Sequence, residues 1–420
     1  MTAGQSNHPP NRPAGRPDRP VADSLARRIT QLQPSATHAI TAKAKALEAK
    51  GIRVIDFGVG EPDFDTPQVV KNAGIAAIQE GWTKYTPPGG LEELKQAVIE
   101  KLKRDQGLTY QPNQILISCG AKHSLYNIAQ ALFEDGDEVL IPAPYWVSYP
   151  EQVRLQGATP VILPTEEAEG FCPSPASLAR ALTPRTKAII LNSPSNPTGA
   201  VYPRPLLEEL GRVLLDHRCI IISDEIYEYF VYEGAEHWSL AGLVPDLIGR
   251  IIIVNGVSKS YAMTGWRIGY AAGPAPILQA MSAIQSQSTS NPTSISQKAA
   301  IIALRSGGTF VSEMVTAFDQ RRRVMADELN QIAGVSCSVP QGGFYLFPRI
   351  SALFGRATPS GQSIGTSADL AAYLLDAAHV AVVPGSAFGA EGFLRFSYAL
   401  PLEQIRAGLT QLREAISTLR

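Results

Sequence analysis

Residues 250–273, RIIIVNGVSKSYAMTGWRIGYAAG, decide how the rest of the chain is interpreted. The run from Ile251 to Val254 consists of β-branched residues and has no polar face to show water, so it predicts a buried strand. Asn255-Gly256 is a strong turn signal, and the strand is predicted to end there. Lys259 follows directly, and Arg267 lies eight positions further on.

The lysine after this strand allows two interpretations. Because Lys259 emerges from a buried strand it is partly desolvated, which favours its neutral, nucleophilic form. Ser258 and Arg267 supply a hydroxyl and a planar set of donors that suit a phosphate group. An amine for a Schiff base beside phosphate ligands is what pyridoxal phosphate (PLP) requires. The alternative is a strand that ends in a surface lysine, with Arg267 paired to a carboxylate.

The composition is that of a globular protein large enough for two domains, with 420 residues, 45% hydrophobic and 18% charged. A formal net charge of −1 gives no electrostatic reason to expect nucleic acid or a membrane surface as a partner. No apolar run approaches the roughly 20 residues of a membrane span. The histidines lack metal-ligand spacing, so no metal site is predicted. The cysteines lie far apart and favour buried, free thiols in the cytoplasm: Cys119, Cys172, Cys219 and Cys337.

Residues 1–23 are predicted to be a disordered tail, because they contain Pro, Gly, Asn and Arg and almost nothing apolar. Without an apolar segment they do not resemble a signal peptide. Arg12, Arg16 and Arg19 favour a transit peptide as the alternative. Asp18 and the prolines disfavour the amphipathic helix that such a peptide needs.

The remaining chain is predicted to form a large and a small domain. Residues 24–59 contain two helical segments and an extended segment, and residues 306–420 contain a long helix, short strands and a closing helix. Together they are assigned to a small α+β domain. Between them, residues 60–305 alternate apolar strands with helical patterns, which implies a mainly parallel α/β sheet with ligands beyond the carboxyl ends of its strands. The predicted strands of this sheet are 115–118, 138–141, 187–191, 219–223, 250–254 and 267–272, and those of the small domain are 54–57, 335–338, 344–347, 380–383 and 394–396. The predicted helices are 24–31, 36–50, 91–102, 124–133, 177–182, 206–216, 309–332 and 402–419.

Polar motifs follow three of the predicted strands. Gly120-Ala121-Lys122 opens a helix whose free N–H groups suit an anion, as in many βα loops. Asn196 lies in a proline-broken turn, where its amide can donate to a phenolate oxygen; a plain Asx-Pro turn is the alternative. Asp224 ends a fully apolar strand, where a carboxylate needs a cationic partner such as a protonated pyridine nitrogen; a helix N-cap is the alternative. Tyr227 follows three residues later and can bind the hydroxylate of the same ring.

In this order and spacing the motifs resemble class I PLP-dependent aminotransferases of fold type I. The motifs are Asn196-Pro-Thr-Gly, Asp224-Glu-Ile-Tyr227, and Ser258-Lys259 followed by Gly-Trp-Arg267-Ile-Gly. Three further segments are similar to the bacterial aspartate aminotransferase branch, subgroup Ib: Gly60-Glu-Pro-Asp-Phe-Asp-Thr-Pro, Lys84-Tyr85-Thr-Pro, and Pro144-Tyr-Trp146-Val-Ser-Tyr-Pro. The resemblance covers residues 24 to 418.

This resemblance implies a fold, a cofactor and a role for each motif residue. Lys259 bonds covalently to PLP and later moves a proton between the substrate and the cofactor. Asp224 pairs with the pyridine nitrogen, and Tyr227 binds the ring oxygen together with Asn196. The implied phosphate ligands are Gly120, Ala121, Lys122, Ser258 and Arg267, joined by Tyr85 from the second subunit of a homodimer. The implied substrate contacts are Gly60, Trp146 (which also stacks on the cofactor ring), Asn196, Lys122, Thr37 and Arg395, the last gripping the α-carboxylate.

One departure from the family pattern bears on the substrate. The animal-type branch carries an arginine shortly before a Ser-Asn-Pro sequence, but here the position that matches it, before Ser290-Asn291-Pro292, is Ser286. Subgroup Ib implies Lys122 with Ser35 or Thr37 instead, which is a less exacting set than an arginine fork. The implied reaction is ping-pong transfer of the amino group of L-aspartate to 2-oxoglutarate. Transamination of prephenate or aromatic oxo acids is the nearest alternative.

Other functions are known on this fold. A PLP-dependent lyase is disfavoured because Lys122, Trp146 and Arg395 are all present. The effector-binding half of a transcription regulator needs a DNA-binding domain, for which the N-terminal tail is too short. A catalytically inactive scaffold is disfavoured by the presence of Lys259 and Asp224.

Overall fold

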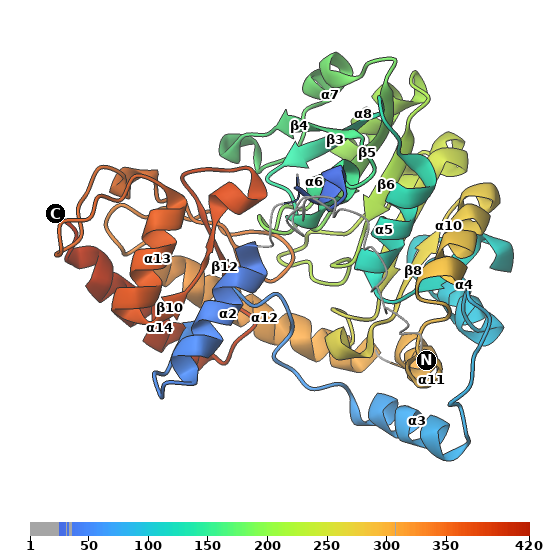
Figure 1. Cartoon of the computed structure of the whole chain (residues 1–420), viewed down its shortest axis with the longest axis horizontal. Coiled ribbons are helices and arrows are strands. Elements are labelled where there is room, and N and C mark those ends of the chain that lie inside the picture. Colours follow the sequence, from blue (N-terminus) through green and yellow to red (C-terminus); the bar gives the residue numbers. More distant parts are fainter. Residues whose placement is uncertain (1–24, 31, 33–35, 307) are drawn as a thin grey trace, which may run out of the picture.

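The computed structural model describes residues 25–420 apart from residues 31, 33–35 and 307 (Figure 1). The predicted tail, residues 1–23, lies outside the described residues, as do Ser24 and Ser35. Of the helices in the described part of the chain, none is long and apolar enough to cross a membrane.

A seven-stranded sheet in the order β2-β8-β7-β6-β5-β3-β4 forms the larger part of the molecule. Neighbouring strands pair in parallel, except that β8 is antiparallel to both β2 and β7, so the prediction of a mainly parallel sheet is confirmed. The strands are β2 (Ile115–Ser118), β3 (Glu138–Ala143), β4 (Thr159–Pro164), β5 (Thr186–Asn192), β6 (Ile220–Asp224), β7 (Ile251–Gly256) and β8 (Gly269–Ala272).

Two expectations about these strands were wrong. Asn255-Gly256 was predicted to be a turn, but it continues β7 and pairs with Tyr270 and Gly269 of β8. Strand β7 lies between β6 and β8, and the hydrogen bonds of a central strand outweigh a local turn preference. Strand β4 was not predicted, because it is an edge strand whose short apolar run, residues 161–163, is flanked by prolines on both sides.

Alternate residues of the central strands enter two separate cores, which explains why the runs are apolar throughout. In β7, Ile251 and Ile253 contribute to one core, and Ile252 and Val254 contribute to the other. The first core is covered by α4 (Glu92–Gln106), α7 (Pro175–Ala181), α8 (Arg204–Leu215), α9 (Leu240–Leu243) and α11 (Ser294–Ser306), with α3 (Gln68–Gln79) packed on α11. The second core is covered by α5 (Ala121–Leu132), α6 (Ser148–Arg154) and α10 (Ala275–Ser288). Helices on both faces leave the strand ends as the place for a site.

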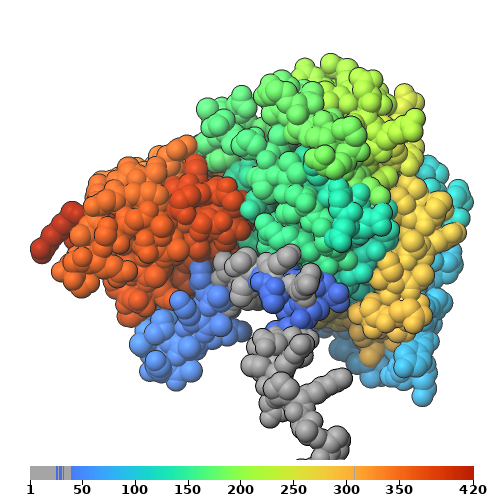
Figure 2. Space-filling view, turned by 45° about the horizontal axis from the view of Figure 1, so that its top comes forward, coloured from blue at the N-terminus to red at the C-terminus, as the bar shows by residue number. Residues whose placement is uncertain are grey.

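The N-terminal and C-terminal segments meet in a smaller α+β unit (Figure 1). β1 (Ile55–Asp56) pairs in parallel with β10 (Val380–Ala381), so residues far apart in sequence share one sheet. A second sheet has the order β11-β12-β9, with β11 at Val383–Pro384, β12 at Leu394–Ser397 and β9 at Tyr345–Leu346. The helices of this unit are α2 (Ala36–Glu48), α12 (Gly308–Leu329), α13 (Ser367–Ala378) and α14 (Leu402–Ser417). The short helix α1 (Arg27–Thr30), dark blue in Figure 1 and in Figure 2, lies on the side of the larger unit.

The cores support the predicted division of the chain, which we propose as 24–59 with 306–420 in a small domain and 60–305 in a large one. Phe57 packs with α14 residues such as Leu409 in the core of the smaller unit. Val311, at the start of α12, packs on the large core, while Phe318 further along that helix packs on the small one. Helix α12 therefore bridges the two units.

Two smaller expectations need correction. Residues 335–338 were predicted to be a strand, but Ser336 makes only an isolated bridge with Arg349. The four cysteines are free, as predicted, but Cys219 and Cys337 alone are buried, whereas Cys119 and Cys172 are partly exposed.

Candidate functional site

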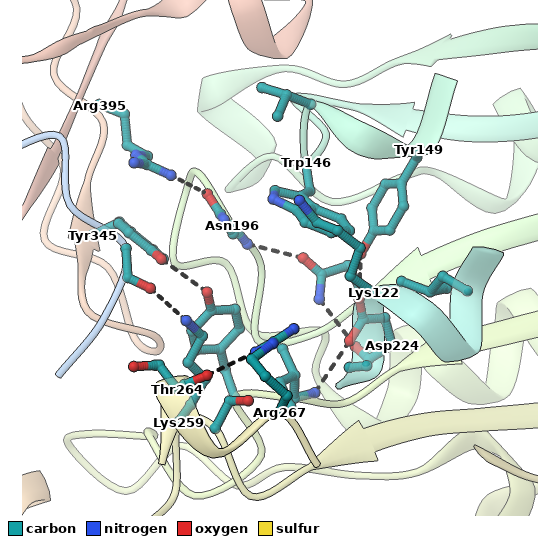
Figure 3. Close-up of a pocket in the computed structure, with 18 residues that line it drawn as sticks. Lys122, Trp146, Tyr149, Asn196, Asp224, Lys259, Thr264, Arg267, Tyr345 and Arg395 are labelled. Carbon is teal, nitrogen blue, oxygen red and sulfur yellow. Dashed lines mark hydrogen bonds between the residues drawn. The ribbon is translucent and has the colours of Figure 1, made fainter. Parts of the chain in front are cut away.

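A cavity of about 470 Å³ lies where the carboxyl ends of β5, β6 and β7 face the smaller unit (Figure 3). In the space-filling view the orange C-terminal part lies directly against the green part of the large unit (Figure 2). Asn192 and Asp224 enter the cavity from strand ends, Lys259 enters from the loop after β7, and Tyr345 and Arg395 enter from the smaller unit. The site is therefore built from both units.

Lys259 lies among positive charges at the centre of the cavity. Its Nζ donates to the carbonyl oxygen of Gly60. Burial is the main reason why the pKa of Lys259 falls to about 8; Glu61 opposes this shift, while the nearby cations, including Arg395 and Arg267, add to it. A substantial fraction of the amine is consequently neutral near physiological pH, as a nucleophile or a general base requires.

Asp224 is a buried carboxylate at the end of β6 with no cation bound to it among the described residues. It is 4% exposed and accepts hydrogen bonds from Tyr149 Oη (2.6 Å) and from the backbone N–H of Ile226 (3.3 Å). Burial raises the pKa of Asp224 to about 6, although these two hydrogen bonds oppose the shift. A cation bound beside it would relieve the cost of burying the charge.

Tyr149 is a site residue that the sequence analysis missed. It lies inside the quoted Pro144-Tyr-Trp146-Val-Ser-Tyr-Pro segment, but its neighbour Trp146 was the residue given a role. Trp146 lies two residues before α6 begins, so helical spacing does not relate the two residues and no local signal marked Tyr149. Their rings meet edge to face at 5.3 Å.

A concave, positively charged corner lies at the start of α5. Gly120 caps this helix without a side-chain bond and has a φ of 91°. A Cβ at Gly120 would collide with the guanidinium of Arg267, and a Cβ at Gly269 would collide with the backbone nitrogen of Ala121. Ser258 lines the cavity beside this corner. Close backbone approach, a helix start and an arginine together form an anion site.

Arg395 is a buried guanidinium that forms no ion pair with any described residue. It is 2% exposed and donates to Asn196 Oδ1 (3.0 Å) and to the carbonyl oxygen of Gly58 (2.6 Å), while its Nε has no hydrogen-bond partner. An arginine is always charged, so a buried one without a counter-ion is suited to an anionic ligand. A carboxylate is the anion that its planar donors match best.

Lys122 closes the other side of the cavity. Its Nζ lies 4.9 Å from the centre of the Trp146 ring, so the charge faces the aromatic wall. Burial and the neighbouring Arg267 lower the pKa of Lys122. Figure 3 shows Lys122 and Trp146 on the side of the cavity opposite Arg395, so two anionic groups of one ligand can be held apart.

Most of the predicted site residues meet in this cavity, and two of those that the structure fully describes, Gly120 and Tyr85, do not line it. Gly120 lies behind its wall against Arg267. Tyr85 is 91% exposed, away from this cavity, and Thr37 belongs to α2 but its side chain lies outside the described residues. The predicted residues that line the cavity are Gly60, Ala121, Lys122, Trp146, Asn196, Asp224, Tyr227, Ser258, Lys259, Arg267 and Arg395; those that the sequence analysis missed include Tyr149, Thr264 and Tyr345.

A second group of buried carboxylates lies next to Asp224 on the chain. Glu225, Glu228 and His237 place ligand atoms within 4.8 Å of one another, which could in principle hold a metal ion. Glu225 accepts from Ser239 Oγ (2.7 Å), however, and Glu228 is paired with the buried ammonium of Lys101. These bonds already satisfy the carboxylates, so we interpret the group as a support for the end of β6.

The chain is similar to known proteins over most of its length. Residues 52–412 match the family described as aminotransferase class I and II. An aspartate aminotransferase of Geobacillus stearothermophilus is 51% identical over 388 residues, which cover 92% of this chain and 98% of the relative. A bifunctional aspartate aminotransferase and glutamate/aspartate-prephenate aminotransferase of Petunia hybrida is 49% identical, over 94% of this chain and 84% of the relative. The crystal structure of the aspartate aminotransferase from Rhizobium meliloti matches with a TM-score of 0.91 and 45% identity, over 94% of this chain and 99% of that chain.

Proposed function

This chain belongs to the aminotransferase class I and II family, and we propose that it transfers the amino group of L-aspartate to 2-oxoglutarate with PLP as its cofactor. One observation carries the proposal: a nucleophilic lysine, a buried carboxylate and an unpaired buried guanidinium share one cavity. Its fold is fold type I, as in the aspartate aminotransferases of known structure.

The residues of the cavity fit PLP at three points. Asp224 offers a carboxylate to the pyridine nitrogen, the corner formed by Gly120 and Arg267 accepts the phosphate, and Lys259 supplies the amine. When bound, PLP supplies an electron sink for the carbanion that forms at the substrate's Cα. Tyr227 and Asn196 lie where they can donate to the ring oxygen, and Trp146 offers its face to the ring.

The protein's own part in the reaction is to bind, orient and move a proton. Arg395 holds the α-carboxylate of the substrate through paired donors, with the backbone of Gly60 beside it. With the cofactor bound, Lys259 would take the proton from the substrate's Cα and return it on the cofactor side, a role for which its lowered pKa is suited. Asp224 would keep the ring nitrogen protonated, because a buried carboxylate stabilises the protonated, cationic form of the ring.

We propose that Lys122 binds the second carboxylate of aspartate. It lies across the cavity from Arg395, and Ser286, at the position of the animal-type arginine, is instead exposed on α10. A lysine is a single point charge and discriminates less than an arginine fork. Together with the bifunctional relative from Petunia hybrida, this favours prephenate as a second acceptor.

The two half-reactions test the proposal directly. The absorption spectrum of the PLP-loaded protein is recorded with L-aspartate and no acceptor, and again after 2-oxoglutarate is added. We expect aspartate to convert the cofactor band to that of pyridoxamine phosphate, and 2-oxoglutarate to reverse the change. Glutamate followed by prephenate ranks the second acceptor. A band that ignores aspartate but responds to other amino acids would contradict the proposed substrate.

Replacing Tyr149 by phenylalanine should make PLP binding more sensitive to acid. The Tyr149 hydrogen bond lowers the pKa of Asp224, which burial holds at about 6, so its loss raises that pKa further. Because only the carboxylate form pairs with the ring cation, PLP affinity is lost as the pH falls through this pKa. Affinity should therefore decline at a pH about one unit higher than in the wild type.

The measurement is the dissociation constant of PLP from the apoprotein between pH 5 and pH 8. Tyr373→Phe, at a tyrosine that bonds to Ala415 and Thr418 far from the cavity, is the matched control. A Tyr149 variant with the wild-type pH profile would show that Tyr149 does not support the carboxylate.

We propose that the protein is a homodimer whose subunits complete each other's sites. Tyr85 projects into solvent with 91% of its surface exposed, and α3 exposes the apolar side chains Val69, Ile75 and Ile78. Burying these apolar side chains against a second subunit would remove them from water, which is favourable. A two-fold dimer would also let Tyr85 reach the phosphate corner of the other subunit.

Mixing two inactive variants tests the shared site. Lys259→Ala and Tyr85→Ala subunits are each expected to be strongly impaired alone. After the subunits are exchanged, a mixed dimer holds one site with both residues intact. Random pairing should therefore recover about a quarter of the wild-type activity. No recovery, with mixed dimers verified by mass, would contradict shared sites.

We also propose that the protein acts in the cytoplasm. Its four cysteines are free, and the relatives it matches most closely in length are bacterial enzymes. Free, partly exposed thiols persist in a reducing compartment.

A further inference from the structure

Tyr345 links the two halves of the cavity and had no role in the sequence analysis. It lies on β9 opposite Ser397 of β12, two residues after Arg395, so Tyr345 and Arg395 point to the same face of that sheet. The phenol is 1% exposed. The guanidinium carbon of Arg395 lies 4.5 Å from the centre of the Tyr345 ring. The Tyr345 hydroxyl lies 2.8 Å from the hydroxyl of Tyr227 (Figure 3).

The start of β9 is held tightly by the large unit, so this hydroxyl has little freedom. The backbone N–H of Gly343 donates to the carbonyl of Phe230 (2.9 Å), and the Gly343 carbonyl accepts from the hydroxyl of Tyr232 (2.6 Å). A Cβ at Gly60 would lie only 2.9 Å from Tyr345 Oη. The Tyr345 hydroxyl is thus held between the backbone at Gly60 and the hydroxyl of Tyr227.

Two phenols that share one hydrogen bond must divide the roles of donor and acceptor. If Tyr227 is to donate to the ring oxygen of the cofactor, its own oxygen is left to accept, and Tyr345 must be the donor. Burial raises the pKa of both phenols, and the Arg395 charge opposes this at both. The shift is larger at Tyr227, where the interaction with Tyr345 adds to it. The more acidic phenol is the better donor, and a hydrogen bond received by Tyr227 polarises its own O–H.

We propose that Tyr345 is a positioning residue that donates to Tyr227 and so directs the Tyr227 proton towards the ring oxygen of the bound cofactor. Arg395 supports both donors to that oxygen: it lies over the Tyr345 ring and donates to Asn196 Oδ1, so that the amide nitrogen of Asn196, which lines the cavity, is left to donate elsewhere. The inference rests on the proposed PLP function. Under this proposal Arg395 has two roles: it binds the α-carboxylate of the substrate, and before substrate binds it orients the two donors to the ring oxygen of the cofactor.

A double-mutant cycle read from the spectrum of bound PLP tests the proposal without turnover. Hydrogen bonds to the ring oxygen stabilise its anion, so they lower the pH at which the absorption band of bound PLP changes. Tyr227→Phe should raise this pH by about one to two units. Tyr345→Phe keeps the stacked ring and should raise it by about half a unit. In the Tyr227→Phe background, Tyr345→Phe should add nothing.

Tyr398→Phe is the matched control, since its buried hydroxyl donates to the Gly343 carbonyl (2.9 Å) and does not touch Tyr227. It should leave the titration unchanged. An unchanged titration for Tyr345→Phe, or an equal shift with and without Tyr227, would overturn the role of Tyr345. If the wild type shows no pH-dependent PLP band at all, the proposed cofactor function fails instead, so the two failures are distinguishable.

Discussion

Replacing Lys259 by alanine should lower kcat for transamination by about 10⁴-fold or more. A well-placed general base alone contributes roughly 10²–10⁴-fold, and Lys259 is also the nucleophile that bonds the cofactor. Its amine is enclosed beside Gly60, and burial lowers its pKa to about 8, so no other described amine in the cavity is as well prepared. Among the described residues, Lys122 is the only other lysine that lines the cavity, and it faces the Trp146 ring.

Two measurements check this prediction. Borohydride reduction of the PLP-loaded wild type should fix the cofactor to the peptide that contains Lys259, and the same peptide of the variant should carry none. The matched control is Lys187→Ala. Lys187 is a partly exposed lysine of β5 that pairs with Asp137, and its replacement should keep full activity. A Lys259 variant that still fixed the cofactor at that peptide, or kept kcat within tenfold, would refute the assignment.

Replacing Asp224 by asparagine should lower kcat by roughly 10²–10⁴-fold while preserving the shape of the site. Removing one partner of a buried charged pair costs about 3–5 kcal/mol, and each 1.36 kcal/mol is one decade in rate. Asparagine still accepts the hydrogen bond of Tyr149 but carries no charge to hold a proton on the ring nitrogen. The loss should therefore appear in the rate at which the substrate's Cα proton is removed.

A cofactor analogue separates this electrostatic role from a structural one. When the pyridine nitrogen of PLP is replaced by carbon, the carboxylate has no cation to stabilise. Wild type and Asp224→Asn should then be slow to a similar degree. If the variant remained far slower than the wild type with the analogue, its defect would be structural, and the proposed pairing of Asp224 with the ring would be wrong.

The sequence predicted polar residues at the strand ends, and the resemblance of the motifs favoured cofactor roles for them over a surface lysine, an Asx-Pro turn or a helix N-cap. Lys259, Asp224 and Asn196 each follow a strand that is apolar on both faces, and a parallel sheet brings such ends to one edge. That signal is local, because a few consecutive residues contain both the buried strand and the polar group after it. The mainly parallel sheet followed from the same local pattern, whereas the role of Gly120 at a phosphate was implied only by the resemblance.

Only the tertiary structure decided which groups these residues meet. Tyr149 reaches Asp224 from 75 positions away, and Tyr345 reaches Tyr227 from 118 positions away. No periodicity or turn signal marks such a pair, because the contact depends on how two separately formed elements pack. The same reason explains why Asn255-Gly256 remained in a strand, since its neighbours in the sheet outweighed its own turn preference. Local chemistry therefore predicted the candidate site residues, and the packing of separately formed elements set the hydrogen bonds that orient them.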